Sequence, residues 1–181
     1  MKYESWYWLP ALAAPLVISM PGAYAVTYLT VEQAQQALFP GASEFSRLDI
    51  ELTAKQKKAI EERADVRVRN TKPAIWRVAA EDRQLGWFLV DRVLGKHEFI
   101  TYAVALDTQG AVRGVEILEY RETHGGEVRK ARWRAQFVGK GAEDRLELGR
   151  GIVNIAGATL SCKHVTEGIR RLIATFEEVL K

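Results

Sequence analysis

Four short runs of β-branched and aromatic residues, separated by turns, constrain the fold of this chain more than any other feature. The runs cover residues 74–78, 86–93, 99–106 and 111–120, and a shorter run of alternating valine and arginine precedes them at residues 66–69. Between the last two runs, residues 107–110 read Asp-Thr-Gln-Gly, which is typical of a turn. Strands joined by such short connections pair in the antiparallel sense. We therefore expect a meander that forms one antiparallel sheet.

Helical patterns lie on both sides of the predicted strands. Thr30 followed by Gln33, and Thr53 followed by Gln56, have the form of capping boxes and predict two helices that end near residues 39 and 64. From about residue 162 to the C-terminus, apolar residues recur at helical spacing. The predicted fold class is therefore α+β, an antiparallel β-sheet packed with helices, the last of them a long C-terminal helix.

The N-terminal segment has the pattern of a targeting signal. Residues 6–20 are apolar and uncharged, and the small-residue pattern Ala23-Tyr24-Ala25 follows them. This pattern predicts a secretory signal peptide, residues 1–25, and a periplasmic location. The apolar run is shorter than the ~20 residues of a membrane-spanning helix, and an uncleaved membrane anchor is the alternative. The predicted organisation continues with an N-terminal helical and first-strand region, residues 26–83, and a main domain, residues 84–181.

Most familiar functional motifs are absent from the sequence. It contains neither a nucleophile elbow nor a phosphate-binding loop of the G-x-x-x-x-G-K-[ST] type. Cys162 and His164 are one residue apart near a helix start, so their side chains point in different directions, and no metal site is assigned. The basic cluster in residues 129–134 is typical of a solvated helix face, and the net charge of +3 does not indicate nucleic-acid binding. No catalytic residue is assigned.

One segment has the chemistry of an anion site. Residues 157–161 read Gly-Ala-Thr-Leu-Ser and lie just before the C-terminal helix. Small residues let a ligand approach the backbone closely, Thr159 and Ser161 supply hydroxyl groups, and the first amides of a helix favour a phosphate. The same residue types are also common as helix N-caps. From these residues alone, a phosphate site and a plain helix cap both remain open.

Three motifs in order resemble those of a known family. Residues 156–161, A-G-A-T-L-S, resemble the [ST]-G-A-T-x-[ST] motif of the FMN-binding domain family, which includes flavin-carrying subunits of the sodium-pumping NADH:quinone reductase and of a related electron-transport complex. Residues 118–126 resemble the family's E-T-x-G signature, which lines the flavin pocket, and residues 133–140 resemble its W-x-x-x-F-x-G-K segment. The resemblance covers roughly residues 84–180.

The resemblance implies FMN as the cofactor. In the family, a flavin transferase joins the FMN phosphate to the motif threonine through a phosphoester, and in this sequence that residue is Thr159. The FMN-binding residues implied are Thr159, Gly157, Ala158, Leu160, Ser161, Glu122, Thr123, Gly125, Gly126, Trp133 and Lys140.

The resemblance also implies a function, with alternatives. It indicates an exported electron-transfer protein that acts as a redox carrier and not as a self-contained enzyme, with a flavin transferase as maturation partner. Its redox partners would be other proteins, with membrane-bound and haem-bearing proteins among the candidates. The chain departs from the family motif at Ala156, where serine or threonine is usual, and at Val153, where aspartate is usual. A non-covalent flavin- or ligand-binding sensor module and a structural subunit without redox activity therefore remain alternatives.

Overall fold

The computed structural model describes residues 26–181 of the chain. The predicted signal peptide, residues 1–25, lies outside the described residues. Among residues 26–181, no helix has both the length and the apolar character that crossing a membrane would require.

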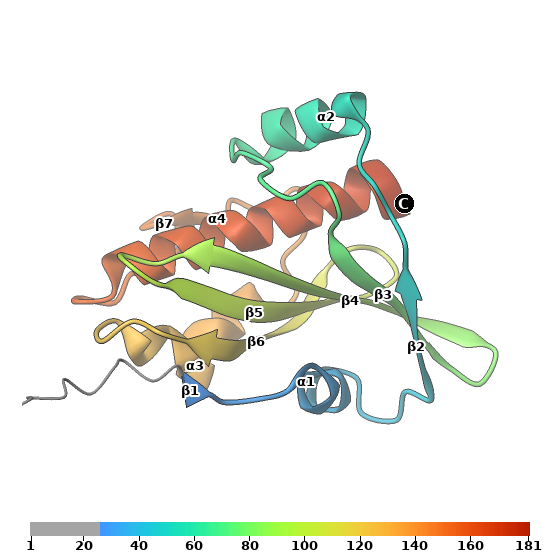
Figure 1. The fold of residues 1–181 in the computed structure, drawn as a ribbon, viewed down its shortest axis with the longest axis horizontal. Coiled ribbons are helices and arrows are strands. Elements are labelled where there is room, and N and C mark those ends of the chain that lie inside the picture. Colours follow the sequence, from blue (N-terminus) through green and yellow to red (C-terminus); the bar gives the residue numbers. More distant parts are fainter. Residues whose placement is uncertain (1–25) are drawn as a thin grey trace, which may run out of the picture.

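A six-stranded antiparallel sheet lies at the centre of the described fold (Figure 1). The strands are ordered β1, β6, β5, β4, β3, β2, so consecutive strands from β2 to β6 are neighbours in the sheet. The predicted antiparallel meander and the α+β fold class are confirmed. The strand bounds are β1 Val26–Thr27, β2 Glu44–Leu48, β3 Ala74–Ala80, β4 Arg83–Leu94, β5 Phe99–Leu106, β6 Val112–Tyr120 and, in a separate parallel pair, β7 Glu147–Leu148 and β8 Gly151–Ile152.

Helices cover both faces of this sheet. The long C-terminal helix α4, Thr159–Thr175, packs on one face, and α1, Val31–Leu38, packs on the other (Figure 1). The helix α2, Ala54–Ala64, lies on the far side of α4 from the sheet. The central strand β5 is buried along most of its length, as expected for a strand covered on both faces. The remaining helical turns are η1 Gly126–Arg129, α3 Ala131–Arg134, η2 Ala135–Phe137 and the π-helical η3 Phe176–Leu180.

The helix starts predicted from the two capping boxes are confirmed. Thr30 accepts a hydrogen bond from the Gln33 backbone N–H, and the Gln33 side chain accepts one from the Thr30 N–H. Thr53 and Gln56 form the same reciprocal pair at the start of α2. Each pair satisfies amide groups that the first turn of a helix leaves without partners, so these local sequences fix where α1 and α2 begin.

One predicted strand is wrong. Residues 66–69 alternate valine and arginine but form no strand. The backbone N–H of Val68 donates instead to the Glu61 side chain of α2 at 2.8 Å. Val68 is buried in a small cluster with residues of α2 and α4, whereas Arg67 and Arg69 are exposed. The alternation therefore reflects packing of an extended segment against helices, which a periodicity of two cannot distinguish from pairing in a sheet.

Candidate functional site

The N-terminus of α4 presents backbone amides without acceptors. The helix begins at Thr159, earlier than the predicted start near Cys162, with Ala158 as its N-cap residue. The first backbone hydrogen bond of this turn runs from the Cys162 N–H to the Ala158 carbonyl at 2.9 Å. Within residues 26–181, the N–H groups of residues 159–161 have no acceptor and no side chain caps them. Free amides at the positive end of a helix dipole favour an anion.

Thr159 presents its hydroxyl at this exposed helix start. Its Oγ1 accepts a hydrogen bond of 3.0 Å from Asn154 Nδ2. Thr159 is the first helical residue, so the alternative that its hydroxyl caps the helix is wrong. Gly157 has a φ of +84°, which favours glycine, and no atom lies within 4 Å of the position that a Cβ would take. The space beside Gly157 is therefore open, and Thr159 itself is exposed, whereas the neighbouring Ala158 is buried.

Asn154 is a site residue that the sequence analysis missed. It lies outside the A-G-A-T-L-S motif, and no spacing rule marks it. The conformation of the segment between β8 and α4 places the Asn154 side-chain amide next to the Thr159 hydroxyl. The side chain of Val153 next to it is 68% exposed, so the position where the family has aspartate points toward solvent here.

Ser161 does not face the open space. It is buried, and its Oγ lies 3.1 Å from the Tyr120 hydroxyl, which donates to the His124 carbonyl at 2.5 Å. Burial raises the pKa of Tyr120 despite the opposing hydrogen bond from Ser161, so the phenol stays protonated at neutral pH and remains a donor. Ser161 and Tyr120 thus join the end of β6 to the first turn of α4. The sequence analysis missed Tyr120, although it ends the strand two residues before Glu122.

The segment of residues 122–126, here called the glycine loop, packs directly against the start of α4. Gly125 is buried with a φ of +82°. A Cβ there would lie 2.8 Å from the Tyr120 hydroxyl, 3.1 Å from Ser161 Oγ and 3.4 Å from Ala158 Cα. Only glycine fits such a position without strain. The structure therefore brings together the two segments that the sequence resemblance assigned to one pocket.

We expect Tyr120→Phe to loosen the glycine loop. The change removes one hydroxyl and leaves the His124 carbonyl without its donor, so we expect a loss of about 1 kcal/mol in the free energy of unfolding. Amide hydrogen exchange at residues 124–126 should become faster than in the wild type. Tyr28→Phe is the control, because the Tyr28 hydroxyl makes no hydrogen bond within residues 26–181. Unchanged exchange at residues 124–126 would show that the hydroxyl does not hold the loop.

Glu122 stabilises the tip of the β4–β5 hairpin. Its Oε1 accepts hydrogen bonds from the backbone N–H groups of His97, at 2.5 Å, and Glu98, at 3.0 Å. Partial burial tends to raise the pKa of Glu122, but the backbone donors of residues 96–98 outweigh it and the pKa is lowered from 4.5. The carboxylate therefore ties the hairpin tip to the glycine loop at neutral pH.

The stabilisation that Glu122 gives to the hairpin tip through its hydrogen bonds should depend on pH. Because the pKa of Glu122 is lowered in the folded state, its stabilisation is present above pH 4.5 and is lost as the pH falls through the lowered pKa. We expect the amide resonances of His97 and Glu98 to shift with this titration below pH 4.5. In Glu122→Gln the same resonances should lose this titration, and its persistence in that variant would assign it to another group.

Thr123 and Trp133 support the site in different ways. Thr123 is exposed in the glycine loop, with its Oγ1 2.9 Å from His124 Nδ1, and remains open to a ligand. Trp133 is buried, and its Nε1 donates to the Val153 carbonyl at 2.9 Å. Its ring packs edge-on against Phe137, with centroids 5.2 Å apart. Through its hydrogen bond to the Val153 carbonyl, the buried Trp133 holds the segment that precedes Thr159 in position.

Lys140 lies at the other end of β6. Its carbonyl accepts the Val112 N–H at 2.8 Å, and its Nζ lies 3.6 Å from Asp144. The nine residues of β6 separate Val112 from Tyr120 by about 26 Å. The structure thus does not bring Lys140 to the other predicted site residues.

Two further features bear on what the site can bind. Leu160 is 43% exposed and Val153 68% exposed, so apolar surface flanks Thr159. Cys162 is buried, and burial raises the pKa of its thiol. Among residues 26–181, no group of three histidine, cysteine, aspartate or glutamate side chains is placed to hold a metal ion.

Comparison with known families gives one match. Residues 95–174 match the family described as FMN-binding domain. The matched segment begins before β5 and ends near the C-terminus of α4, and it includes the glycine loop and the helix start at Thr159. No curated protein matches the chain.

Proposed function

We propose that the protein is an exported electron carrier with its FMN attached to Thr159, starting from the match of residues 95–174 to the FMN-binding domain family, whose cofactor is FMN. The observation that carries the attachment is the exposed Thr159 hydroxyl in a helix turn whose first three amides have no acceptor among the described residues. A phosphate ester at this oxygen would lie next to those amides.

The residues present fit FMN. The free amides of residues 159–161 and the helix dipole suit a phosphate group. The apolar surface of Leu160 and Val153 suits a flat ring. The exposed Thr123 hydroxyl in the glycine loop can donate to or accept from polar atoms of the ring or the ribityl chain.

Attachment requires an activated flavin nucleotide, because a free monophosphate does not esterify an alcohol spontaneously. We propose that a flavin transferase presents a flavin dinucleotide to Thr159. The P–O bond to Thr159 Oγ1 forms, the phosphoanhydride bond breaks, the nucleoside monophosphate leaves, and the hydroxyl proton passes to solvent. Asn154 holds Oγ1 in place with its 3.0 Å hydrogen bond and supplies a polar side chain beside the non-polar Val153 and Ala156.

The exposure of the site supports the electron-carrier role. Bound FMN supplies reversible redox chemistry, and Thr159 and Thr123 are both exposed on the surface of the protein. An open site suits electron exchange with partner proteins, and the ester prevents loss of the cofactor after export. We propose cleavage after Ala25, a periplasmic location, and redox proteins, membrane-bound or haem-bearing, as partners.

The experiment that tests this proposal is an intact mass of the protein after co-expression with a flavin transferase. We expect a mass gain of one FMN less one water on a chain that begins at Val26, with fluorescence on a denaturing gel and the modification mapped to the peptide that contains Thr159. Chemical titration should then show reversible reduction of the bound flavin. An unmodified mass with yellow native protein would replace attachment with non-covalent flavin, and a colourless protein would favour a structural subunit.

A further inference from the structure

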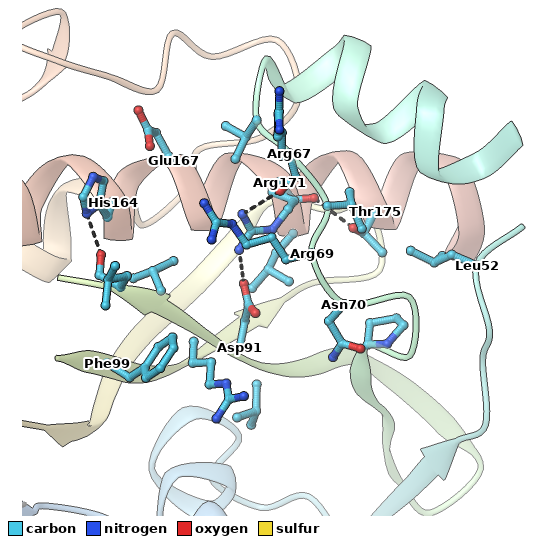
Figure 2. A pocket seen from close by; sticks show the side chains of 18 of the residues that line it. Leu52, Arg67, Arg69, Asn70, Asp91, Phe99, His164, Glu167, Arg171 and Thr175 are labelled. Atoms are coloured by element: carbon cyan, nitrogen blue, oxygen red, sulfur yellow. Dashed lines mark hydrogen bonds and ion pairs between the residues drawn. The ribbon is translucent and has the colours of Figure 1, made fainter. Parts of the chain in front are cut away.

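A groove of about 580 Å³ lies beside the flavin site, between α4, β4 and the segment of residues 65–73 that joins α2 to β3 (Figure 2). We call it the arginine groove. The lining residue of α4 nearest to Thr159 is His164, five residues or about 7.5 Å further along the helix. Most of the remaining lining precedes residue 95 and lies outside the matched FMN-binding domain. Most of the groove therefore lies outside the segment that matches the FMN-binding domain family.

Two arginines on one wall have free guanidinium groups. Arg67 and Arg69 alternate with the buried Val68, so both side chains leave the extended segment on its exposed side. Within residues 26–181, neither guanidinium has a hydrogen-bond or ion-pair partner. Arginine forks match the geometry of carboxylate, sulfonate and phosphate groups. The guanidinium groups of Arg67 and Arg69 are therefore free to bind an anionic group.

The acidic groups of the groove do not cancel this charge. Asp91 on β4 is engaged by Arg171 of α4 at 2.6 Å, and Glu167 lies 3.8 Å from Lys163. The remaining carboxylate is the exposed Asp65. Figure 2 shows Arg171 of α4 and Asp91 of β4 pointing toward each other, joined by their ion pair.

The opposite end of the groove is apolar and aromatic. Phe99 and Leu94, which flank the tip of the β4–β5 hairpin, are each 44% exposed. The Arg92 guanidinium lies 4.8 Å from the centroid of the Phe99 ring, which leaves a flat cationic and aromatic surface. A volume of about 580 Å³ is in the range of small-molecule sites.

We propose that the arginine groove binds a small organic anion with a flat apolar body. The anionic group pairs with Arg67 and Arg69, and the body lies along the surface of Phe99 and Leu94. The buried contact between Asp91 and Arg171 holds the floor in position. This proposal depends on the groove alone and stands whether or not FMN is attached to Thr159.

The test is a titration of the isotope-labelled protein with naphthalene-2-sulfonate, followed by backbone amide resonances. We expect the shifts to gather at residues 66–70, at Leu94 and at Glu167. Arg67→Gln with Arg69→Gln should weaken binding at least tenfold. The matched control, Arg77→Gln with Arg83→Gln, removes the same charge from exposed positions outside the groove and should change binding less than twofold.

The neutral analogue naphthalene-2-sulfonamide should bind at least tenfold more weakly than the sulfonate, because it lacks the charge that Arg67 and Arg69 recognise. Three results would overturn the proposal. They are equal binding by the wild type and the Arg67→Gln, Arg69→Gln variant, equal loss in the control variant, and shifts confined to residues outside the groove. Thermal unfolding of both double variants checks that each remains folded.

Discussion

We expect Thr159→Val to abolish the proposed covalent attachment of FMN and to leave the fold intact. Valine has nearly the shape of threonine but offers no oxygen for the phosphoester. Thr159 is exposed, it does not cap α4, and its hydroxyl makes one hydrogen bond, to Asn154. We therefore expect the free energy of unfolding to fall by less than about 1 kcal/mol. Intact mass after co-expression with the transferase should show the bare chain, and the denaturing gel should show no fluorescent band.

Two variants make this result specific. Thr159→Ser keeps a hydroxyl at the same backbone position and should retain attachment, at a reduced rate. Thr123→Val removes another exposed hydroxyl of the same site, on the glycine loop, and should leave the mass gain unchanged. A wild-type mass gain in Thr159→Val would place the ester at another residue.

Asp91→Ala should lower the free energy of unfolding by about 3–5 kcal/mol. Asp91 Oδ2 accepts hydrogen bonds from Arg171 Nη2 at 2.6 Å and from the Tyr102 hydroxyl at 2.9 Å. The two charged side chains are only 18% and 15% exposed, and Tyr102 is fully buried. Burial first, and then the charge of Asp91, raises the pKa of Tyr102, so the phenol stays a donor. Removal of the carboxylate leaves the buried Tyr102 hydroxyl without its acceptor and leaves the part-buried Arg171 with only its hydrogen bond to the Arg67 carbonyl.

Urea unfolding of matched variants measures this effect. Asp82→Ala removes an exposed carboxylate from the β3–β4 turn and should change stability by less than about 0.5 kcal/mol. Combining Asp91→Ala with Arg171→Met should cost less than the sum of the two single changes, because the double variant buries no unpaired charge. A loss below about 1 kcal/mol in Asp91→Ala would show that water replaces the carboxylate.

The same network explains a glycine in the middle of α4. A Cβ at Gly168 would lie 2.0 Å from the Tyr102 hydroxyl. Glycine normally weakens a helix interior relative to alanine. At this position it lets Tyr102 reach beneath α4 to Asp91. No sequence pattern indicates this, because the contact joins residues more than sixty positions apart in the chain.

The sequence indicated a helix start beside the A-G-A-T-L-S motif because that signal is local. The A-G-A-T-L-S segment places Thr159 at a helix start, and Gly125 of the glycine loop is the N-cap residue of η1. It did not indicate that Ser161 is buried against Tyr120 or that Trp133 supports Val153 from beneath. Those roles depend on contacts between segments that are far apart in the sequence, because these contacts determine which side chains become buried.

The sequence by itself determined the elements whose signals are local: two capping boxes, the strands of the meander and the apolar side of the C-terminal helix. These follow from hydrogen bonding within four residues and from periodic burial. The tertiary structure decided the rest. It packed residues 66–69 on helices instead of in the sheet, placed Lys140 far from Thr159, and brought Asn154 to that hydroxyl. The physical reason is that these outcomes depend on packing between segments far apart in the chain, and a local pattern is compatible with more than one such packing.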